Sequence, residues 1–256
     1  MRHPASSPRT VVYQFGPGPI TLAVKLLIWS NVALYLLDAL VIPNRWPGIT
    51  LLDYVCGLQA PAVFERYWVW QPVTYMFLHA GPFHLLFNML TLWMFGVERE
   101  RRWGWRFFLK YYFVAGIGAA ATTLLLALLP GRMGAVMYGS LTVGASGAIY
   151  GLLLAYGLYF PDRPIYMWAL FPIPAKYFVM IMGAIALLSS VGGDRGGVAN
   201  SAHLGGLVVG YVYLRVWPSH PLDGIKYRYV RFRMNRLRRK FDVHTGGRSD
   251  WDRRVH

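Results

Sequence analysis

The sequence is poor in cysteine and in charged residues. Its one cysteine, Cys56, excludes an intrachain disulfide and a cysteine-based metal site. Charged residues make up only 14% of the 256 residues, whereas soluble domains carry roughly 25%. Apolar residues make up 55%, and the mean hydropathy is positive. These values argue against a water-soluble domain and favour a membrane protein.

Six apolar segments approach the length of about 20 residues that a transmembrane helix needs. They are residues 20–42, 82–97, 107–129, 144–160, 172–191 and 200–217. The first is too long for the apolar part of a signal peptide, and no convincing cleavage site follows it, so we expect a retained helix. The sequence therefore predicts an all-α polytopic membrane protein of six transmembrane helices. Its parts are a short N-terminal segment, a membrane domain and a basic tail, at residues 1–19, 20–217 and 218–256.

The chain has a large excess of positive charge, with 26 Lys and Arg against 11 Asp and Glu. Residues 220–256 hold 11 Lys or Arg and 4 Asp. A second basic group lies between the second and third predicted helices, at Arg99, Arg101, Arg102, Arg106 and Lys110. With six spans both groups fall on one side, and positive residues favour the cytoplasmic side. We expect cytoplasmic termini and a tail that touches lipid or solvent, and not a nucleic-acid-binding protein.

Polar residues lie near the starts of the second, fourth and sixth predicted helices. They are His84 and Asn88, then Ser146, then His203. These three helices run through the membrane in the same direction, and a helix rises 1.5 Å per residue, so all four residues lie within roughly 10 Å of the outer end. Ionisable residues inside a membrane indicate function by default.

Glycines lie on the faces of the helices that carry Ser146 and His203. Gly147 and Gly151 form a small-residue pair beside the serine, and Gly206 lies three residues after the histidine, on the same face. Small residues allow two helix backbones to approach closely. We therefore expect these two helices to pack closely enough for the hydroxyl to meet the imidazole.

A serine beside a histidine is suited to nucleophilic catalysis. Serine needs a base to accept its proton, and His203 can serve. The oxyanion that forms needs donors, which the first N–H groups of the serine helix, Asn88 and His84 can supply. No Asp or Glu lies near these helix starts, so we expect a two-residue dyad. Taken singly, Ser146 is more typical of helix packing, and each histidine of a structural or proton-handling role. His84 and His203 could also be metal ligands, but His79 is the one candidate for a third strong ligand at that depth.

Three stretches of sequence carry a family resemblance. "HAGPFHLLFNML" at 79–90, "GASGAIYG" at 144–151 and "AHLGG" at 202–206 together resemble the rhomboid family of intramembrane serine proteases. The resemblance covers roughly residues 60–215 and implies the basic form of that fold, a rhomboid-like bundle of six transmembrane helices.

The resemblance also implies roles for single residues. Ser146 is similar to the family nucleophile, with Gly144 as a flanking glycine that lines the substrate site. His203 is similar to the general base, and Tyr150 to the tyrosine that packs against it. His84 and Asn88 match the pair that lines the oxyanion site. A structural motif at the turn after the second helix is matched by Glu100, Arg102 and Gly104.

The activity implied is a serine endopeptidase that cleaves transmembrane helices of membrane-protein substrates near the outer face, through an acyl-enzyme. Neither a metal nor a cofactor is implied, and the partners are membrane-protein substrates and lipids. A bacterial inner membrane is the expected location. One alternative is a rhomboid-like pseudoprotease that binds clients without cleaving them. Another, a small transporter or channel, would place its polar residues near the midplane of the membrane.

Three further expectations concern the connections. Residues 43–81, rich in aromatic side chains, are expected to form a loop that anchors at the membrane surface. The family often has Trp-Arg within it, where this chain has Trp70 and Gln71, so the anchoring by an arginine is in doubt. The glycine-rich residues 191–200 are expected to form a mobile cap over the site, with the helix at 172–191 as a gate; a plain flexible turn is the alternative.

Overall fold

The computed structural model describes residues 17–40, 49–167, 171–190 and 195–216. Within them the chain folds as an all-α bundle, and each of the six predicted membrane segments contains a helix. The long helices are α1 (Leu22–Leu40), α5 (Pro82–Thr91) with η2 (Leu92–Gly96) and α6 (Val97–Trp103), α7 (Trp105–Ala127), α9 (Ser146–Tyr159), α10 (Ala175–Ser190) and α11 (Arg195–Val216). The predicted tail, residues 218–256, and most of the N-terminal segment lie outside the described residues.

Not every described helix is long enough to cross a bilayer alone. By length and composition α1 and α7 qualify, and a third span is formed if Gln71–Phe77 and Pro82–Trp103, which meet at a bend of 97°, are taken together. α9 has 14 residues and α10 has 16. The count of six spans therefore stays a prediction, although the helical bundle is present.

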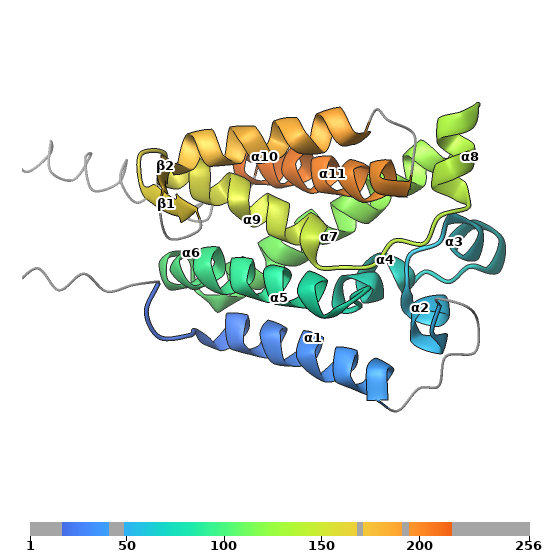
Figure 1. Cartoon of the computed structure of the whole chain (residues 1–256), viewed down its shortest axis with the longest axis horizontal. Helices are drawn as coiled ribbons and strands as arrows, with labels where there is room; N and C mark the ends of the chain where they lie inside the picture. Colours follow the sequence, from blue (N-terminus) through green and yellow to red (C-terminus); the bar gives the residue numbers. More distant parts are fainter. Residues whose placement is uncertain (1–16, 41–48, 168–170, 191–194, 217–256) are drawn as a thin grey trace, which may run out of the picture. The chain divides into compact units, whose positions relative to one another are not determined.

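Helix α9 lies at the centre of the described bundle. It packs against α7, α10 and α11 and also contacts α5; Figure 1 shows it between α5 on one side and α10 and α11 on the other. Ten of its 14 residues are buried. The hydroxyl of Tyr111 in α7 donates a 2.7 Å hydrogen bond to the carbonyl oxygen of Gly151. A helix that is apolar all round in this way is held from every side by its neighbours.

The described part of the connection between α1 and α5, residues 49–81, is folded into short helices. It contains the short helices α2 (Leu51–Cys56), α3 (Ala60–Arg66), α4 (Gln71–Thr74) and η1 (Tyr75–Phe77). Thr50 begins α2 with a capping box, in which its hydroxyl accepts from Asp53 N and its own N–H donates to the Asp53 carboxylate. Proline opens α3 and α4, where its missing N–H has no cost. The expectation of a loop is wrong over these helices, and its location at the membrane surface stays a prediction.

Two further elements complete the described chain. Helix α8 (Arg132–Tyr138) packs on α7, and strands β1 (Pro164–Met167) and β2 (Phe171–Pro174) form an antiparallel hairpin between α9 and α10. Pro164 lies opposite Pro174, and Ile165 opposite Ile173. The sequence interpretation contained neither element.

The expected glycine-rich cap over residues 191–200 is wrong for its second half. Residues 195–200 form the first turns of α11, which runs for 22 residues against α7 and α9. Residues 191–194 lie outside the described residues.

Candidate active site

The structure brings Ser146 and His203 into contact. Ser146 is the first residue of α9, and His203 lies two turns into α11. The Ser146 Oγ and the His203 Nε2 are 2.8 Å apart, which is hydrogen-bonding distance. This is the geometry in which an imidazole can take the proton of a hydroxyl.

Glycines set the distance between α9 and α11. A Cβ at Gly206 would lie 1.9 Å from the carbonyl oxygen of Gly147, and a Cβ at Gly210 would lie 3.2 Å from the Cα of Gly151. The clash at Gly206 cannot be relieved by turning a side chain, because the obstacle is backbone. At Gly210 the Cβ would also lie 2.6 Å from the hydroxyl oxygen of Tyr111. The glycine faces predicted from the sequence are therefore the contact surface that places His203 against Ser146.

Tyr150 fixes the plane of the histidine ring. It lies one turn after Ser146, and its ring stacks on that of His203 with centroids 4.2 Å apart and planes 5° apart. The His203 Nδ1 is buried and has no hydrogen-bond partner in the described part of the chain. Within those residues the arrangement is a serine–histidine pair held by ring stacking, without a carboxylate on the far nitrogen.

His84 lines the same cavity as the serine. Its Nδ1 accepts a 3.3 Å hydrogen bond from Ala80 N, so a neutral ring carries its proton on Nε2 and can donate from there. Gly144 makes this approach possible. It has φ +125°, and a Cβ there would lie 2.9 Å from the His84 Nε2 and 3.7 Å from the Ser146 Oγ. The donor nitrogen of His84 therefore points to the region beside the hydroxyl.

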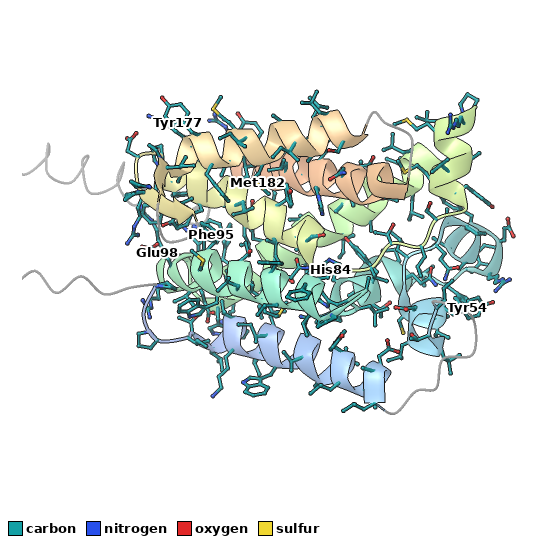
Figure 2. The ribbon with its side chains drawn as sticks, viewed as in Figure 1. Tyr54, His84, Phe95, Glu98, Tyr177 and Met182 are labelled. Atoms are coloured by element: carbon teal, nitrogen blue, oxygen red, sulfur yellow. The ribbon has the colours of Figure 1, made fainter. Side chains whose placement is uncertain are left out.

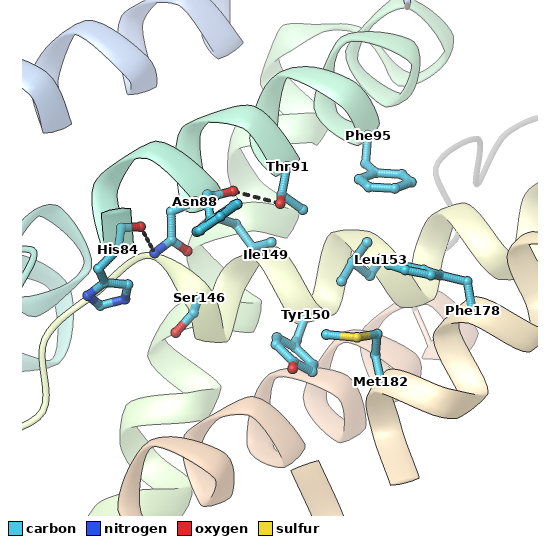
Figure 3. Close-up of a pocket in the computed structure, with 11 residues that line it drawn as sticks. His84, Asn88, Thr91, Phe95, Ser146, Ile149, Tyr150, Leu153, Phe178 and Met182 are labelled. Atoms are coloured by element: carbon cyan, nitrogen blue, oxygen red, sulfur yellow. Dashed lines mark hydrogen bonds between the residues drawn. The ribbon is translucent and has the colours of Figure 1, made fainter. Parts of the chain in front are cut away.

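Asn88 lies one turn after His84, and its side chain is buried. Its Nδ2 donates a 2.8 Å hydrogen bond to the carbonyl oxygen of His84, which uses one of its two amide hydrogens. The second amide hydrogen of Asn88 remains available to a ligand. Figure 3 shows His84, Asn88 and Ser146 grouped at one end of a cavity, with the dashed Asn88 bond holding the amide against α5.

The cavity extends from this polar end between α5, α9 and α10. It has a volume of about 230 Å³, and its remaining lining is mostly apolar: Phe87, Thr91, Phe95, Ile149, Tyr150, Leu153, Phe178 and Met182. Sequence reasoning missed Phe178 and Met182, because apolar residues on an apolar helix carry no signal of a cavity. The sequence also assigned no firm role to His79. In the structure the ring of His79 packs edge-on against that of His84, with centroids 5.0 Å apart.

The predicted structural motif lies in α6 and at its end, two elements after the helix that carries His84 and Asn88. Both oxygens of Glu100 bind the start of α1: Oε1 accepts from Ala23 N and Oε2 from Val24 N, each at 2.9 Å. Gly104, with φ +78°, ends α6 and begins α7. The exposed Arg102 places its guanidinium over the rings of Tyr159 and Phe160, at the end of α9. In Figure 2 this end of the bundle is the one at which Glu98 is labelled.

Comparison with known proteins decides the family. A model of the rhomboid domain matches residues 66–218, more than half of the chain. The chain belongs to the rhomboid family. It is therefore an integral membrane protein, in agreement with its apolar helices.

Proteins with similar sequences come from Arabidopsis thaliana and from Providencia stuartii. RHOMBOID-like protein 1 of Arabidopsis thaliana is 31% identical over 71% of this chain and 43% of its own length. Rhomboid protease AarA of Providencia stuartii is 29% identical over 77% of the chain and 72% of its own length. The mitochondrial RHOMBOID-like protein 6 of Arabidopsis thaliana is 29% identical over 71% of the chain and 54% of its own length. The chain thus spans less than two thirds of these plant rhomboids, and a bacterial inner membrane stays a prediction.

Gln71, where rhomboids often have arginine, does anchor the connection. It is fully buried, its Oε1 accepts a 3.0 Å hydrogen bond from Gln59 N, and its Nε2 donates to the carbonyl oxygens of Val55 and Tyr54. The neighbouring Trp70 donates from Nε1 to Val55 O at 2.9 Å. The neutral amide ties α2, α3 and α4 together through backbone groups, so no ion pair is needed.

Proposed function

We propose that this rhomboid is an intramembrane serine endopeptidase in which Ser146 is the nucleophile and His203 the general base. The observation that carries the proposal is the 2.8 Å contact between the Ser146 Oγ and the His203 Nε2, with Tyr150 stacked on the imidazole. A hydroxyl that served only for helix packing would not need an imidazole held in one plane beside it.

The proposed reaction has two halves. Ser146 Oγ attacks the carbonyl carbon of the scissile peptide bond and gives its proton to the His203 Nε2. The C–N bond then breaks, and His203 passes that proton to the departing amine, leaving an acyl ester on Ser146. Water attacks the ester while His203 takes one of its protons, and the proton returns to the Ser146 Oγ as the acid product leaves.

Three kinds of donor face the carbonyl oxygen as it becomes an oxyanion. They are the Nε2–H of His84, the second amide hydrogen of Asn88 and the first N–H groups of α9, which have no partner within the helix. The N-terminus of α9 also carries partial positive charge. Each donor is fixed by the fold before substrate arrives, which is the condition for electrostatic stabilisation of a transition state.

The length of α9 supports a reaction below the membrane surface. Fourteen residues span about 21 Å, whereas the hydrocarbon core is about 30 Å thick. Ser146, as the first residue of α9, would then lie several ångströms inside the outer boundary, within reach of water and of a substrate helix that has unwound near its end. Both termini would remain cytoplasmic, as the basic residues indicate.

The apolar cavity favours membrane-protein substrates. Its lining suits an apolar side chain next to the scissile bond, and Phe178 and Met182 bring α10 to its edge. We therefore propose α10 as the gate through which a transmembrane segment enters from the lipid. No cofactor takes part in the proposed steps.

The rival proposal is a rhomboid-like pseudoprotease that binds membrane clients without cleaving them. Such a protein would need the fold and the cavity but neither the hydroxyl nor the base. The contact between Ser146 and His203 favours the protease.

The test uses the full chain, purified in detergent, with a fluorescent fluorophosphonate and a substrate that contains a transmembrane helix. We expect the wild-type protein to be labelled and to cleave, Ser146→Ala to lose both activities, and His203→Ala to lose cleavage. Ser140→Ala is the matched control, because the Ser140 hydroxyl donates to the carbonyl oxygen of Val136 in α8 and is not among the residues that line the cavity. Cleavage by Ser146→Ala at the wild-type rate would refute the mechanism, and wild-type binding without cleavage or labelling would favour the pseudoprotease.

A further inference from the structure

A second cluster of charged residues lies far from Ser146, where α6 and α9 end. Three guanidinium groups surround the ring of Phe160: the Cζ of Arg99 lies 4.1 Å from the ring centroid, that of Arg163 5.4 Å and that of Arg102 5.7 Å. We call Arg99, Arg102 and Arg163 the Phe160 arginine cluster. An aromatic face attracts one cation, but it does not offset the repulsion among three.

The acidic residues near the cluster do not balance its charge. Glu98 pairs with Arg163, and Glu100 uses both oxygens on the start of α1. The other ion pair among the described residues joins Lys176 and Asp162 and includes no member of the cluster. Arg99 and Arg102 therefore form no ion pair in the part of the chain that the structure describes, although the Glu98 carboxylate acts on Arg99 over a longer distance.

Arg99 is the unusual member. It is fully buried, and its Nε and both terminal nitrogens have no hydrogen-bond partner among the described residues. A guanidinium has five N–H donors, and a buried charge without hydrogen bonds is costly. The rings of Tyr159 and Trp103 add to the cage, with centroids 4.9 and 5.5 Å from the Arg99 Cζ, but rings accept no strong hydrogen bond. The donors of Arg99 thus lack an acceptor of negative charge.

The position of the cluster indicates the kind of anion. α6 ends at Trp103, α7 begins at Trp105 and α9 ends at Tyr159, so the cluster lies where apolar helices end. Trp105 is 48% exposed and Leu158 is 49% exposed, which gives this end an aromatic and aliphatic border. At such a level a membrane presents lipid headgroups, and the cytoplasmic leaflet is rich in anionic ones.

We propose that the Phe160 arginine cluster binds the phosphate of an anionic phospholipid. Arg102 is exposed and meets the headgroup first, and Arg99 supplies the buried donors. Guanidinium groups fit phosphate oxygens with paired hydrogen bonds, which lysine cannot reproduce. The ring of Phe160 covers Arg99 and is itself only partly buried, so it is the side chain that moves to admit the phosphate.

The experiment measures lipid binding on the full-length protein. The wild-type chain, stripped of lipid in detergent, is titrated with short-chain phosphatidylglycerol or phosphatidylcholine, and bound lipid and the thermal midpoint are recorded. We expect phosphatidylglycerol to bind and to raise the midpoint, and Arg102→Gln or Arg99→Gln to weaken its binding about tenfold, the loss of one charge-assisted contact. Arg106→Gln is the matched control, because it removes the same charge from an exposed arginine that lies over Trp105 and outside the cluster.

Three results would overturn the proposal. The first is equal binding of the two lipids by the wild type. The second is a loss for Arg106→Gln as large as that for Arg102→Gln, which would show an effect of net charge only. The third is the same rise in midpoint from inorganic phosphate alone, which would assign the site to a free anion. Should Arg99→Gln fail to fold, the exposed Arg102→Gln still decides the outcome.

Discussion

Replacing Gly206 by alanine directly tests how the glycine contact controls the dyad. The new Cβ would lie 1.9 Å from the carbonyl oxygen and 2.8 Å from the carbonyl carbon of Gly147, and ordinary contact begins at 3.4 Å. The two helices must therefore separate by about 1.5 Å at this point, because backbone cannot turn aside. His203 lies one turn before Gly206 on the same face, so it moves away with α11.

The separation is large compared with the hydrogen bond that it disturbs. The Ser146 Oγ and His203 Nε2 start 2.8 Å apart, and adding about 1.5 Å takes them beyond hydrogen-bonding distance. A misplacement of about 1 Å can lower a rate by about 100-fold, and overpacking costs about 1–3 kcal/mol of stability. We expect Gly206→Ala to fold with a lower thermal midpoint and to lose about 100-fold in the rate of substrate cleavage and of fluorophosphonate labelling.

The matched control is Gly183→Ala in α10. A Cβ there would meet only the Leu207 Cδ1, at 3.5 Å, which is ordinary contact. It should cleave as the wild type does. Both variants are compared by cleavage rate at equal folded concentration, judged by thermal denaturation. If Gly206→Ala retained cleavage within about threefold, close packing of α9 and α11 would not be what positions the base, and the reasoning would fail.

Other substitutions test single contacts. Tyr150→Phe should retain cleavage because it keeps the stacked ring, whereas Tyr150→Ala should lose about 10-fold or more; equal rates would remove the stacking from the argument. Gln71→Ala should lower the free energy of unfolding by about 1–3 kcal/mol, since the Gln59 N–H is left without an acceptor, and an unchanged thermal midpoint would contradict this. Glu100→Ala should speed amide hydrogen exchange at the start of α1, measured by mass spectrometry, with Glu65→Ala as a control; equal exchange in both variants would mean that the carboxylate does not cap α1.

The sequence predicted the parts of the site that follow helix periodicity. His203 and Gly206 are three residues apart, so they share a face, and Gly147 and Gly151 share another. Those spacings were enough to expect the two helices to meet, because only glycine permits such close backbone contact. The place of Ser146 at the first turn of α9 could be read in the same way, within the usual uncertainty of helix ends.

The sequence did not predict features that depend on contacts between distant segments. Helices α2, α3 and α4 have four to seven residues, too few to show a periodicity, and they are held by bonds such as that of Gln71 to Gln59 N. Arg99 and Arg101 look alike in the sequence, yet the first is buried in an aromatic cage and the second is exposed and donates to the carbonyl oxygen of Pro19. Such differences in burial arise from tertiary packing, which the helix propensity of a residue does not reveal.

On the proposal that Ser146 lies below the membrane surface, the folded connection supports a helix that begins at that depth. A short α9 requires that the chain before it lie at membrane depth without being helical, and irregular backbone is tolerated there only when its polar groups are satisfied. Three of its backbone groups bond to the connection: Thr142 exchanges two 2.9 Å hydrogen bonds with Leu58, and Gly144 N donates to Tyr75 O at 2.9 Å. Leu58 and Tyr75 flank the segment that Gln71 ties together. The connection between α1 and α5 therefore acts on the candidate site through backbone bonds, so a change at Gln71 should reduce cleavage as well as stability.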